Sequence, residues 1–257
     1  RRHTRCGWLS RGLGDVYKRQ GEDYAAILEE AEKEADVIVW DGGNNDAPFI
    51  RPNLWICLAD PHRPGHELEY FPGTINFERA DIILIGKVGF ADPENIEQIQ
   101  ENARRVNPGA RVILRESPLD IPDPGEIEGK RVLVIEDGPT TTHGGMPFGA
   151  GVLAATSNGA MELVDPRPYA VGEIAGIFRQ YPEIGDLLPA MGYGDAQIRD
   201  LEATVNAVEC DLVLVATPID LTRLIDIVHP YMRIGYSLQP EDGVLADAIR
   251  SAVEAAA

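Results

Sequence analysis

An aspartate and two glycines directly follow a short apolar run near the beginning of the chain. Residues 37–40 read Val-Ile-Val-Trp, a run short enough for a buried strand, and Asp41, Gly42, Gly43 and Asn44 come next. Ligands of open α/β sheets bind outside the carboxyl ends of strands, and glycines let them approach the backbone closely. An aspartate at such an end can hold Mg²⁺ beside a nucleotide γ-phosphate, as in a Walker B element. A strand that ends in a turn is the alternative, since Gly and Asn are common turn residues.

Charged or hydroxyl-bearing residues also follow five later apolar runs. If these runs are strands of one doubly wound sheet, their ends share an edge and the side chains there converge. The sequence therefore predicts one site that collects the residues at the strand ends. These residues are Asp41, Asp60, Lys87, Asp137, Asp165 and Thr217.

The loop after Asp60 holds residues that suit phosphate chemistry. His62, Arg63 and His66 lie in this proline-containing stretch. Arg63 can form bidentate hydrogen bonds with a phosphate, and either imidazole can move a proton. A solvated loop without a ligand explains the same residues.

A second loop, which follows the predicted strand 131–135, is rich in hydroxyl groups and glycine. Hydroxyls and glycine amides after a strand, shortly before a helix amino terminus, are typical of an anion-binding loop. A flexible loop without a ligand is the alternative. The residues concerned are Thr140, Thr141, Thr142, His143, Gly144 and Gly145.

Two further motifs have both a functional and a structural explanation. Gly149, Gly151 and Ala154 fit the dinucleotide-binding pattern G-x-G-x-x-A, but a long polar loop separates them from the preceding strand. Close packing of a helix on the sheet explains these glycines as well. Thr217 and Pro218 fit a helix amino-terminal cap with proline at the first helical position, although Thr217 can also bind a ligand.

The elements that must position these residues alternate between strand and helix. Helices are predicted at 23–35, 92–106, 149–158, 172–180, 195–208 and 218–228, and Asp92 and Pro93 suit the cap and first position of the second. Strands are predicted at 37–40, 54–59, 82–85, 111–114, 131–135, 161–164, 212–216 and 232–238. Such alternation indicates an α/β fold with doubly wound, mostly parallel sheets. The stretch 117–129 is rich in proline, glycine and acid, so we expect a domain boundary there, with a second α/β domain over 129–257.

Composition limits the classes of partner. The formal net charge is −19. A surface this acidic does not suit nucleic acid, and the chain has no long apolar run that would span a membrane. Three widely spaced cysteines, Cys6, Cys57 and Cys210, favour neither a disulfide framework nor a zinc site and fit a cytoplasmic protein.

Residues 1–20 differ from the rest of the chain. They carry six Lys or Arg and one Asp, whereas the other 237 residues carry 17 basic and 41 acidic side chains. The run 10–20 resembles translated sequencing-adapter sequence, so we predict that residues 1–20 are non-native and leave them out of the fold argument. We also expect the natural protein to begin upstream of residue 21.

Taken together, six strings resemble the family of cyclic 2,3-diphosphoglycerate synthetases and predicted GTPases. The likeness covers nearly all of residues 21–240. The strings lie at 41–46 (DGGNND), 60–66 (DPHRPGH), 136–147 (EDGPTTTHGGMP), 165–172 (DPRPYAVG), 188–194 (LPAMGYG) and 216–221 (ATPIDL).

The resemblance implies that 21–128 is the carboxyl-terminal part of a P-loop NTPase-like domain. The chain has no G-x-x-x-x-G-K-[ST] sequence, so the P-loop would belong to a part upstream. Carried over, Asp41 would hold Mg²⁺ and Gly42 and Gly43 would face the γ-phosphate. Lys87 lies in Gly-Lys-Val-Gly, where GTPase relatives resemble Asn-Lys-x-Asp, and this departure favours ATP or a relaxed base preference.

The resulting expectation is an enzyme that uses ATP, or GTP, with Mg²⁺ to form a phosphoanhydride within a small phosphorylated acid. A regulatory or metal-delivery GTPase and a dinucleotide-binding oxidoreductase are the alternatives, and a homo-oligomer is a further possibility. Asn44, Asp60 and Lys87 are expected at the cofactor. The residues expected at the phosphorylated substrate are Thr140, Thr141, Thr142, Gly144, Gly145, Arg167 and Thr217. The residues predicted to act in catalysis are Asp41, His62, Arg63, Asp137 and His143.

Overall fold

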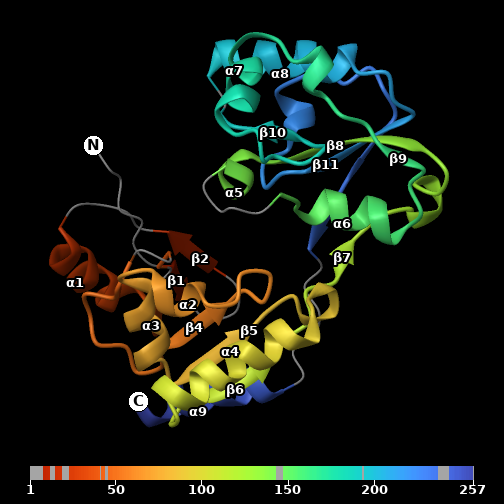
Figure 1. Cartoon of the computed structure of the whole chain (residues 1–257). Coiled ribbons are helices and arrows are strands. Elements are labelled where there is room, and N and C mark those ends of the chain that lie inside the picture. The colour runs from red at the N-terminus through yellow and green to blue at the C-terminus, as the bar shows by residue number, and fades with distance from the viewer. Residues whose placement is uncertain are drawn as a thin grey trace. The chain divides into compact units, whose positions relative to one another are not determined.

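The structure, a computed structural model, describes residues 8–11, 15–18, 23–40, 42–43, 46–142, 147–192, 194–236 and 243–256. The chain divides into two compact units (Figure 1). Unit 1 comprises residues 1–117 and 239–257, and unit 2 comprises residues 118–238. The division falls at the start of the stretch 117–129, in which the sequence predicts a domain boundary.

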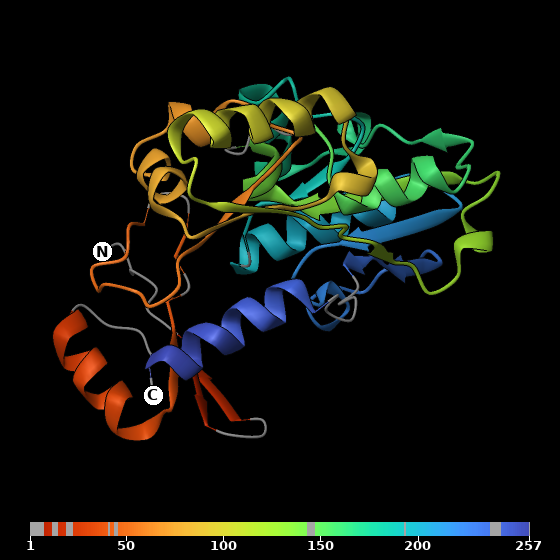
Figure 2. The same cartoon turned by 90° about the horizontal axis from the view of Figure 1, so that it is seen from below.

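Unit 1 contains a small antiparallel sheet. Its order is β2-β1-β3, formed by β1 (Trp8–Arg11), β2 (Asp15–Lys18) and β3 (Val37–Val39), and Figure 2 shows the β1–β2 hairpin. Helix α1 (Tyr24–Glu34) precedes β3 and is capped by Asp23, whose carboxylate accepts a hydrogen bond from the amide of Ala26. Residues set aside in the sequence analysis thus pair with the strand that precedes Asp41.

This pairing corrects one expectation. The strand before Asp41 was predicted to share a sheet edge with the strands before Asp60 and Lys87. Instead β3 pairs antiparallel with β1, and the later strands form a separate sheet. The predicted convergence of Asp41 with the other strand ends therefore has no basis in the strand pairing.

The second sheet of unit 1 is parallel. It has the order β4-β5-β6, with β4 (Ile56–Ala59), β5 (Ile82–Ile85) and β6 (Arg111–Leu114). Helices α2 (His66–Glu69), α3 (Gly73–Arg79) and α4 (Pro93–Val106) connect these strands, together with the short 3₁₀ turn η1 (Val88–Phe90). As predicted, α4 starts at Pro93, and the Asp92 carboxylate accepts a hydrogen bond from the amide of Glu94 at 2.9 Å.

One face of this parallel sheet packs on its helices. The core there includes Ala59, Phe77, Ile83, Ile85 and Ile99, and the last four are fully buried. Burial of large apolar side chains is the main favourable contribution to folding. The helices fix the carboxyl ends of β4 and β5, and those ends carry Asp60 and Lys87.

Unit 2 is built around a long buried strand, β8 (Arg131–Asp137), whose residues 132–135 are fully buried. Its parallel partners are β9 (Glu162–Leu163), β10 (Leu188–Ala190), β11 (Leu212–Ala216) and, beyond β11, β12 (Tyr231–Arg233). The helices are α5 (Gly138–Thr142), α6 (Ala150–Ser157), α7 (Gly172–Gln180) and α8 (Asp195–Ala207). Three 3₁₀ turns accompany them, η2 (Pro124–Glu126), η3 (Arg167–Tyr169) and η4 (Leu221–Arg223).

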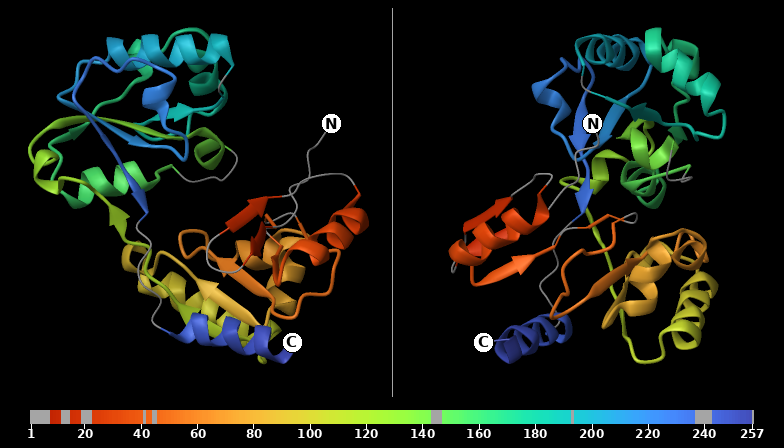
Figure 3. Two further views of the ribbon diagram at one scale, coloured as in Figure 1. Left: turned by 180° about the vertical axis from the view of Figure 1, so that it is seen from behind. Right: turned by 90° about the vertical axis from the view of Figure 1, so that its left-hand side faces the viewer.

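The path of the chain through this sheet reverses at β8. From β8 the chain moves to β9 and β10 on one side, and then crosses to β11 and β12 on the other. Helix α6 lies on one face of the sheet, with α7 and α8 on the opposite face (Figure 3). The α/β fold with mostly parallel sheets is therefore confirmed. The reversal makes the carboxyl ends of β8 and β11 the position at which such sheets bind ligands.

Two elements connect the units along the sequence. β7 (Leu119–Asp120) pairs antiparallel with β13 (Gly235–Tyr236), and the chain then returns to unit 1 with α9 (Val244–Ala256). In the described ranges, no helix is long and apolar enough to cross a membrane.

The helix predicted at 218–228 is absent from this described stretch, which holds only η4. The Thr217 hydroxyl donates a hydrogen bond to the carbonyl of Ile219 at 2.7 Å, and Asp220 has an extended backbone. The threonine therefore forms a local turn instead of capping a helix at Pro218.

Candidate functional site

In unit 1, Asp60 gathers two cations at the carboxyl ends of β4 and β5. Its Oδ2 atom accepts hydrogen bonds from Lys87 Nζ and from Arg63 Nη2, both at 3.0 Å. Its Oδ1 atom accepts a hydrogen bond from the backbone amide of His62 at 3.1 Å. The structure thus brings together four residues that the sequence analysis selected. We call Asp60, His62, Arg63 and Lys87 the Asp60 cluster.

The charges of the Asp60 cluster set its protonation. Burial alone would raise the pKa of Asp60, but the charge and hydrogen bond of Lys87, the His62 amide and Arg63 outweigh it, so that this pKa lies below its ordinary value. The pKa of His62 lies below its ordinary value, mainly because the imidazole is buried. The charge of Asp60 opposes this change, and the charges of Lys87 and Arg63 add to it. At neutral pH, Asp60 is therefore ionised and the His62 imidazole is neutral, able to accept a proton.

Lys87 has an unusual backbone conformation for its type. Its φ of 57° lies in the left-handed region, which costs a non-glycine residue roughly 1 kcal/mol or more. Its amide donates to the Ser117 hydroxyl at 3.4 Å, and its side chain pairs with Asp60. The backbone after β5 therefore aims an ammonium group at the carboxylate that follows β4.

In unit 2, a buried carboxylate lies near the end of β8. Glu136 is 3% exposed, and its Oε1 atom accepts hydrogen bonds from the amides of Gly151, at 2.8 Å, and Val152, at 3.1 Å. Burial raises the pKa of Glu136 to about 7, although these amide hydrogen bonds oppose the change. Glu136 is not among the site residues predicted from the sequence. Strand alternation contained the signal, since Glu136 shares a face with Val132 and Val134.

The glycines of the G-x-G-x-x-A motif pack against this carboxylate. A methyl group on Gly149 would lie 2.4 Å from Glu136 Oε2, and one on Gly151 would lie 2.6 Å from Val134 Cγ1. The motif thus lets the first turn of α6 approach β8 and satisfy Glu136. This packing explains both glycines without a dinucleotide.

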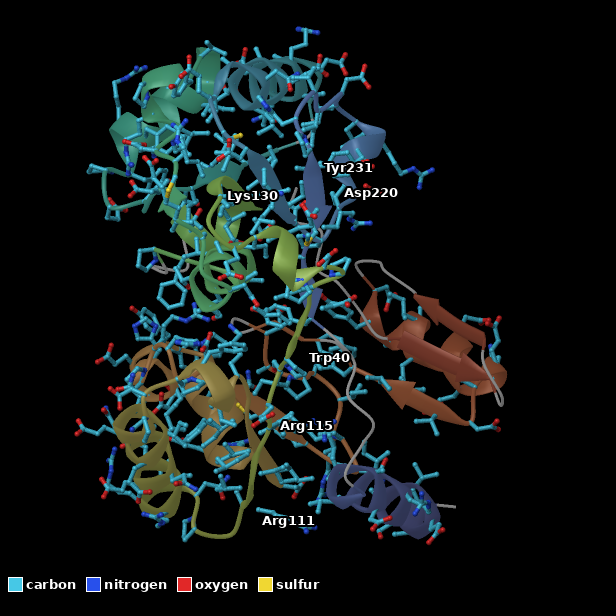
Figure 4. All side chains as sticks on the ribbon, turned by 90° about the vertical axis from the view of Figure 1, so that its right-hand side faces the viewer. Trp40, Arg111, Arg115, Lys130, Asp220 and Tyr231 are labelled. Carbon is cyan, nitrogen blue, oxygen red and sulfur yellow. The ribbon has the colours of Figure 1, made fainter. Side chains whose placement is uncertain are left out.

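Asp137 and Thr217 lie beside each other at the strand ends of unit 2. Ala216 pairs with Glu136 across β11 and β8, so Asp137, the last residue of β8, and Thr217, the residue after β11, occupy adjacent positions at the strand ends. Asp137 is half-buried, whereas Thr217 is 5% exposed. A carboxylate and a hydroxyl therefore mark the reversal point of the sheet. Beyond them lies Asp220, which is labelled in Figure 4. Its carboxylate accepts a hydrogen bond from the Thr222 hydroxyl at 2.7 Å and lies 3.5 Å from the Arg233 guanidinium.

The threonines after β8 lie in the short helix α5. The hydroxyls of Thr141 and Thr142 are buried and both donate to the Gly138 carbonyl at 2.9 Å. Both hydroxyls therefore form hydrogen bonds within α5. The side chain of Thr140, and all of His143, Gly144 and Gly145, lie outside the described residues.

Arg167 is held by groups of its own unit. Its guanidinium donates to Asp165 at 3.0 Å, to Asp186 at 3.4 Å and to the Ile184 carbonyl, and it lies 5.1 Å from the ring centre of Phe178. Asp165 follows β9, which pairs with residues 131–132 at the start of β8. The predicted gathering of all strand-end residues at one edge is therefore wrong, because β9 ends near the opposite end of β8 from Asp137.

The first motif of the sequence analysis is described only in part. Asp41 and Asn44 lie outside the described residues, so the Mg²⁺ assignment of Asp41 stays a prediction. Gly42 lies against the ring of Trp40, and the amide of Gly43 donates to Asp46 Oδ2 at 3.2 Å. Within the described part of the chain, no group of three or more His, Cys, Asp or Glu side chains is arranged to hold a metal ion.

Comparison with known proteins corrects the expected family. No protein-family model matches the chain. The chain is 53% identical over 232 residues to a protein of Thermococcus kodakarensis named arginine synthetase ArcE. This match overturns the resemblance to cyclic 2,3-diphosphoglycerate synthetases and predicted GTPases. The match likewise contradicts the expected formation of a phosphoanhydride and the GTPase and oxidoreductase alternatives.

The strings behind that resemblance lie at strand ends, where α/β enzymes of different activities place their binding residues, so they do not specify one reaction. The match covers 90% of this chain and 51% of the Thermococcus protein. The chain is thus similar over nine tenths of its length to a protein named for arginine synthesis, and spans about half the length of that protein.

Proposed function

We propose that this chain forms part of a nucleotide-dependent synthetase that makes arginine. The observation that carries the proposal is the 53% identity over 232 residues to the arginine synthetase of Thermococcus kodakarensis. A synthetase drives bond formation with the cleavage of a nucleoside triphosphate. The enzyme therefore needs a place for phosphates and a place for arginine.

The Asp60 cluster is our candidate for the phosphates of ATP. Lys87 and Arg63 each lie 3.0 Å from one carboxylate oxygen, at the carboxyl ends of parallel strands. A phosphate can take the place of that carboxylate, with Arg63 as a bidentate donor. Asp60 is then available to Mg²⁺, which is commonly held by one or two carboxylates together with substrate phosphates. ATP and Mg²⁺ are therefore the cofactors that we propose.

The carboxyl ends of β8 and β11 are our candidate for arginine. Unit 2 carries 18 acidic and seven basic residues over 118–238, which favours a cationic substrate. A guanidinium group has five donors and pairs well with a carboxylate, and Asp137 is a half-buried carboxylate at the reversal point of the sheet. The Thr217 oxygen beside it is an additional acceptor.

A chimera tests the proposal. The 232 matched residues of the Thermococcus protein are replaced by those of this chain, and the reverse reaction is measured. The reverse reaction starts from arginine, the product of the synthetase. One assay supplies arginine with ADP and phosphate, and a second supplies arginine with AMP and pyrophosphate. In both, the ATP formed is detected with luciferase. We expect ATP formation that requires arginine. The intact Thermococcus protein is the positive control.

A chimera that has a cooperative melting transition but makes no ATP from arginine, under conditions in which the Thermococcus protein does, would contradict the proposal. ATP formation that proceeds equally well with lysine in place of arginine would contradict the arginine assignment alone. These two results separate a failure of the reaction type from a failure of the substrate.

A further inference from the structure

The edge strand β4 exposes an apolar side chain. β4 lies at one edge of the β4-β5-β6 sheet, and its residues 56–59 (Ile-Cys-Leu-Ala) include no charge and no proline. Cys57 and Ala59 point to the helix-covered face, so Leu58 points to the opposite face, where it is 74% exposed. An uncharged edge strand with an exposed leucine is a template for pairing with another strand.

Most other edge strands of the described sheets carry a charged residue or a proline, which we call a guard. Charges and proline on an edge prevent unwanted pairing. Figure 4 labels Arg111 at the start of β6 and Tyr231 at the start of β12. Among the edge strands whose side chains the structure describes, the guards are Arg111 on β6, Asp120 on β7, Glu162 on β9, Pro189 on β10 and Arg233 on β12.

β3 and β13 also lack a guard, but both belong to antiparallel sheets. Antiparallel sheets tolerate water on one face, whereas all-parallel sheets are usually covered on both faces. β4 belongs to an all-parallel sheet, in which Leu58 lacks this cover. The edge of β4 is therefore the one that most needs a partner.

The length of the relative indicates what that partner is. The chain spans 51% of the Thermococcus protein, so about half of that protein has no counterpart in the matched region. We propose that a strand from this unmatched half pairs in parallel with the outer edge of β4, and that the segment after it covers Leu58. This pairing is inferred from the relative's length and from the unguarded edge of β4, and not from the relative's activity. A negative result for the proposed function would therefore leave the pairing unchanged.

Hydrogen exchange on a split protein tests this pairing. Residues 1–257 and the unmatched part of the Thermococcus protein are produced as separate polypeptides and mixed. We expect amides of residues 56–59 to gain protection on mixing. Leu58→Lys should weaken binding roughly tenfold or more, because the new ammonium would be buried without a partner. Its melting temperature should equal that of the unsubstituted chain, since Leu58 is largely exposed.

Val228→Lys is the matched control, because Val228 is 72% exposed but lies in unit 2. It should bind as the unsubstituted chain does. Two results would overturn the inference. One is mixing without new protection at residues 56–59, or binding that Leu58→Lys leaves unchanged. The other is a dimer of this chain alone that Leu58→Lys dissociates, because a second copy would then be the occupant of the edge.

Discussion

The Oε1 atom of Glu136 accepts a hydrogen bond from the amide of Gly151 at 2.8 Å, and this bond fastens the end of β8 to the first turn of α6. The carboxyl is nearly inaccessible to water, and its pKa is raised to about 7 by burial. The folded protein therefore keeps the Glu136 proton at pH values at which the unfolded chain has released it.

This difference makes stability depend on pH. Glu136 has a folded pKa of about 7 and an ordinary value of 4.5, so its contribution to the free energy of unfolding is largest below pH 4.5 and is lost as the pH rises to about 7. By linkage the loss is on the order of 3 kcal/mol. Glu136→Gln removes this dependence. Urea unfolding at pH 5 and pH 8 should show the variant gaining stability, relative to the unsubstituted chain, at the higher pH.

Glu128→Gln, at an exposed position of the same unit, is the control and should change little between the two pH values. A Glu136→Gln variant whose stability relative to the unsubstituted chain is the same at both pH values would show that Glu136 ionises normally.

Gly151 should not tolerate a side chain. In Gly151→Ala the new methyl group would lie 2.6 Å from Val134 Cγ1 and 3.0 Å from Ala216 Cβ, so α6 must move away from the sheet. We expect a loss of about 1–3 kcal/mol in the free energy of unfolding. Gly176→Ala, inside α7 and in ordinary contact only with Arg179, should instead stabilise by about 0.5–1 kcal/mol. Equal effects of the two substitutions in urea unfolding would refute this account of the motif.

Lys87→Met tests the proposed phosphate site. In the chimera we expect the rate of ATP formation to fall by about 100-fold, as expected for removal of a charge that stabilises a transferring phosphoryl group. The melting temperature should change little, because partly exposed ion pairs contribute roughly 1 kcal/mol or less. Lys33→Met, at an exposed lysine of α1, should leave the rate unchanged. A full rate in the Lys87 variant would remove this residue from the nucleotide site.

Asp137→Asn tests the proposed arginine site. Asparagine keeps the shape but loses the charge that pairs with a guanidinium, so the KM for arginine should rise by about tenfold or more, with the KM for ADP unaffected. Asp226→Asn is the matched control, since Asp226 is exposed and its backbone, not its carboxylate, makes the recorded hydrogen bonds. If both variants keep the normal KM for arginine, the site lies elsewhere.

Arg167→Lys separates a structural role from a substrate role. Lysine cannot reproduce the planar fork that joins Asp165, Asp186 and the Ile184 carbonyl, so we expect about 1–3 kcal/mol of lost stability. The KM for arginine should not change. The opposite result, a raised KM with normal thermal stability, would return Arg167 to the substrate-binding residues.

The alternation of strand and helix could be read from the sequence because each apolar run is short and ends in glycine, proline or acid. The strands 82–85, 111–114 and 212–216 have the predicted bounds, and α4 begins at its predicted cap. These features are local, so they depend little on the rest of the chain.

Other features depend on contacts that the sequence does not encode locally. β10 was missed because Pro189 argues against a strand, and it is accommodated because β10 is an edge strand. The separation of β3 from the parallel strands depends on its pairing with β1. Within the sites, Asp60 and Lys87 could be placed together from strand order, whereas Glu136 required knowledge of which face of β8 meets α6. The reaction could not be read from these strings, because several chemistries use the same residues at strand ends.

The division of the chain has a consequence for biosynthesis. Unit 2 is continuous in sequence, whereas unit 1 is interrupted by it and is completed by α9. A ribosome that makes the chain from its amino terminus releases all of unit 2 before the last helix of unit 1 appears. Unit 1 must therefore wait through the synthesis of about 120 residues in an incomplete state, and unit 2 can finish folding first.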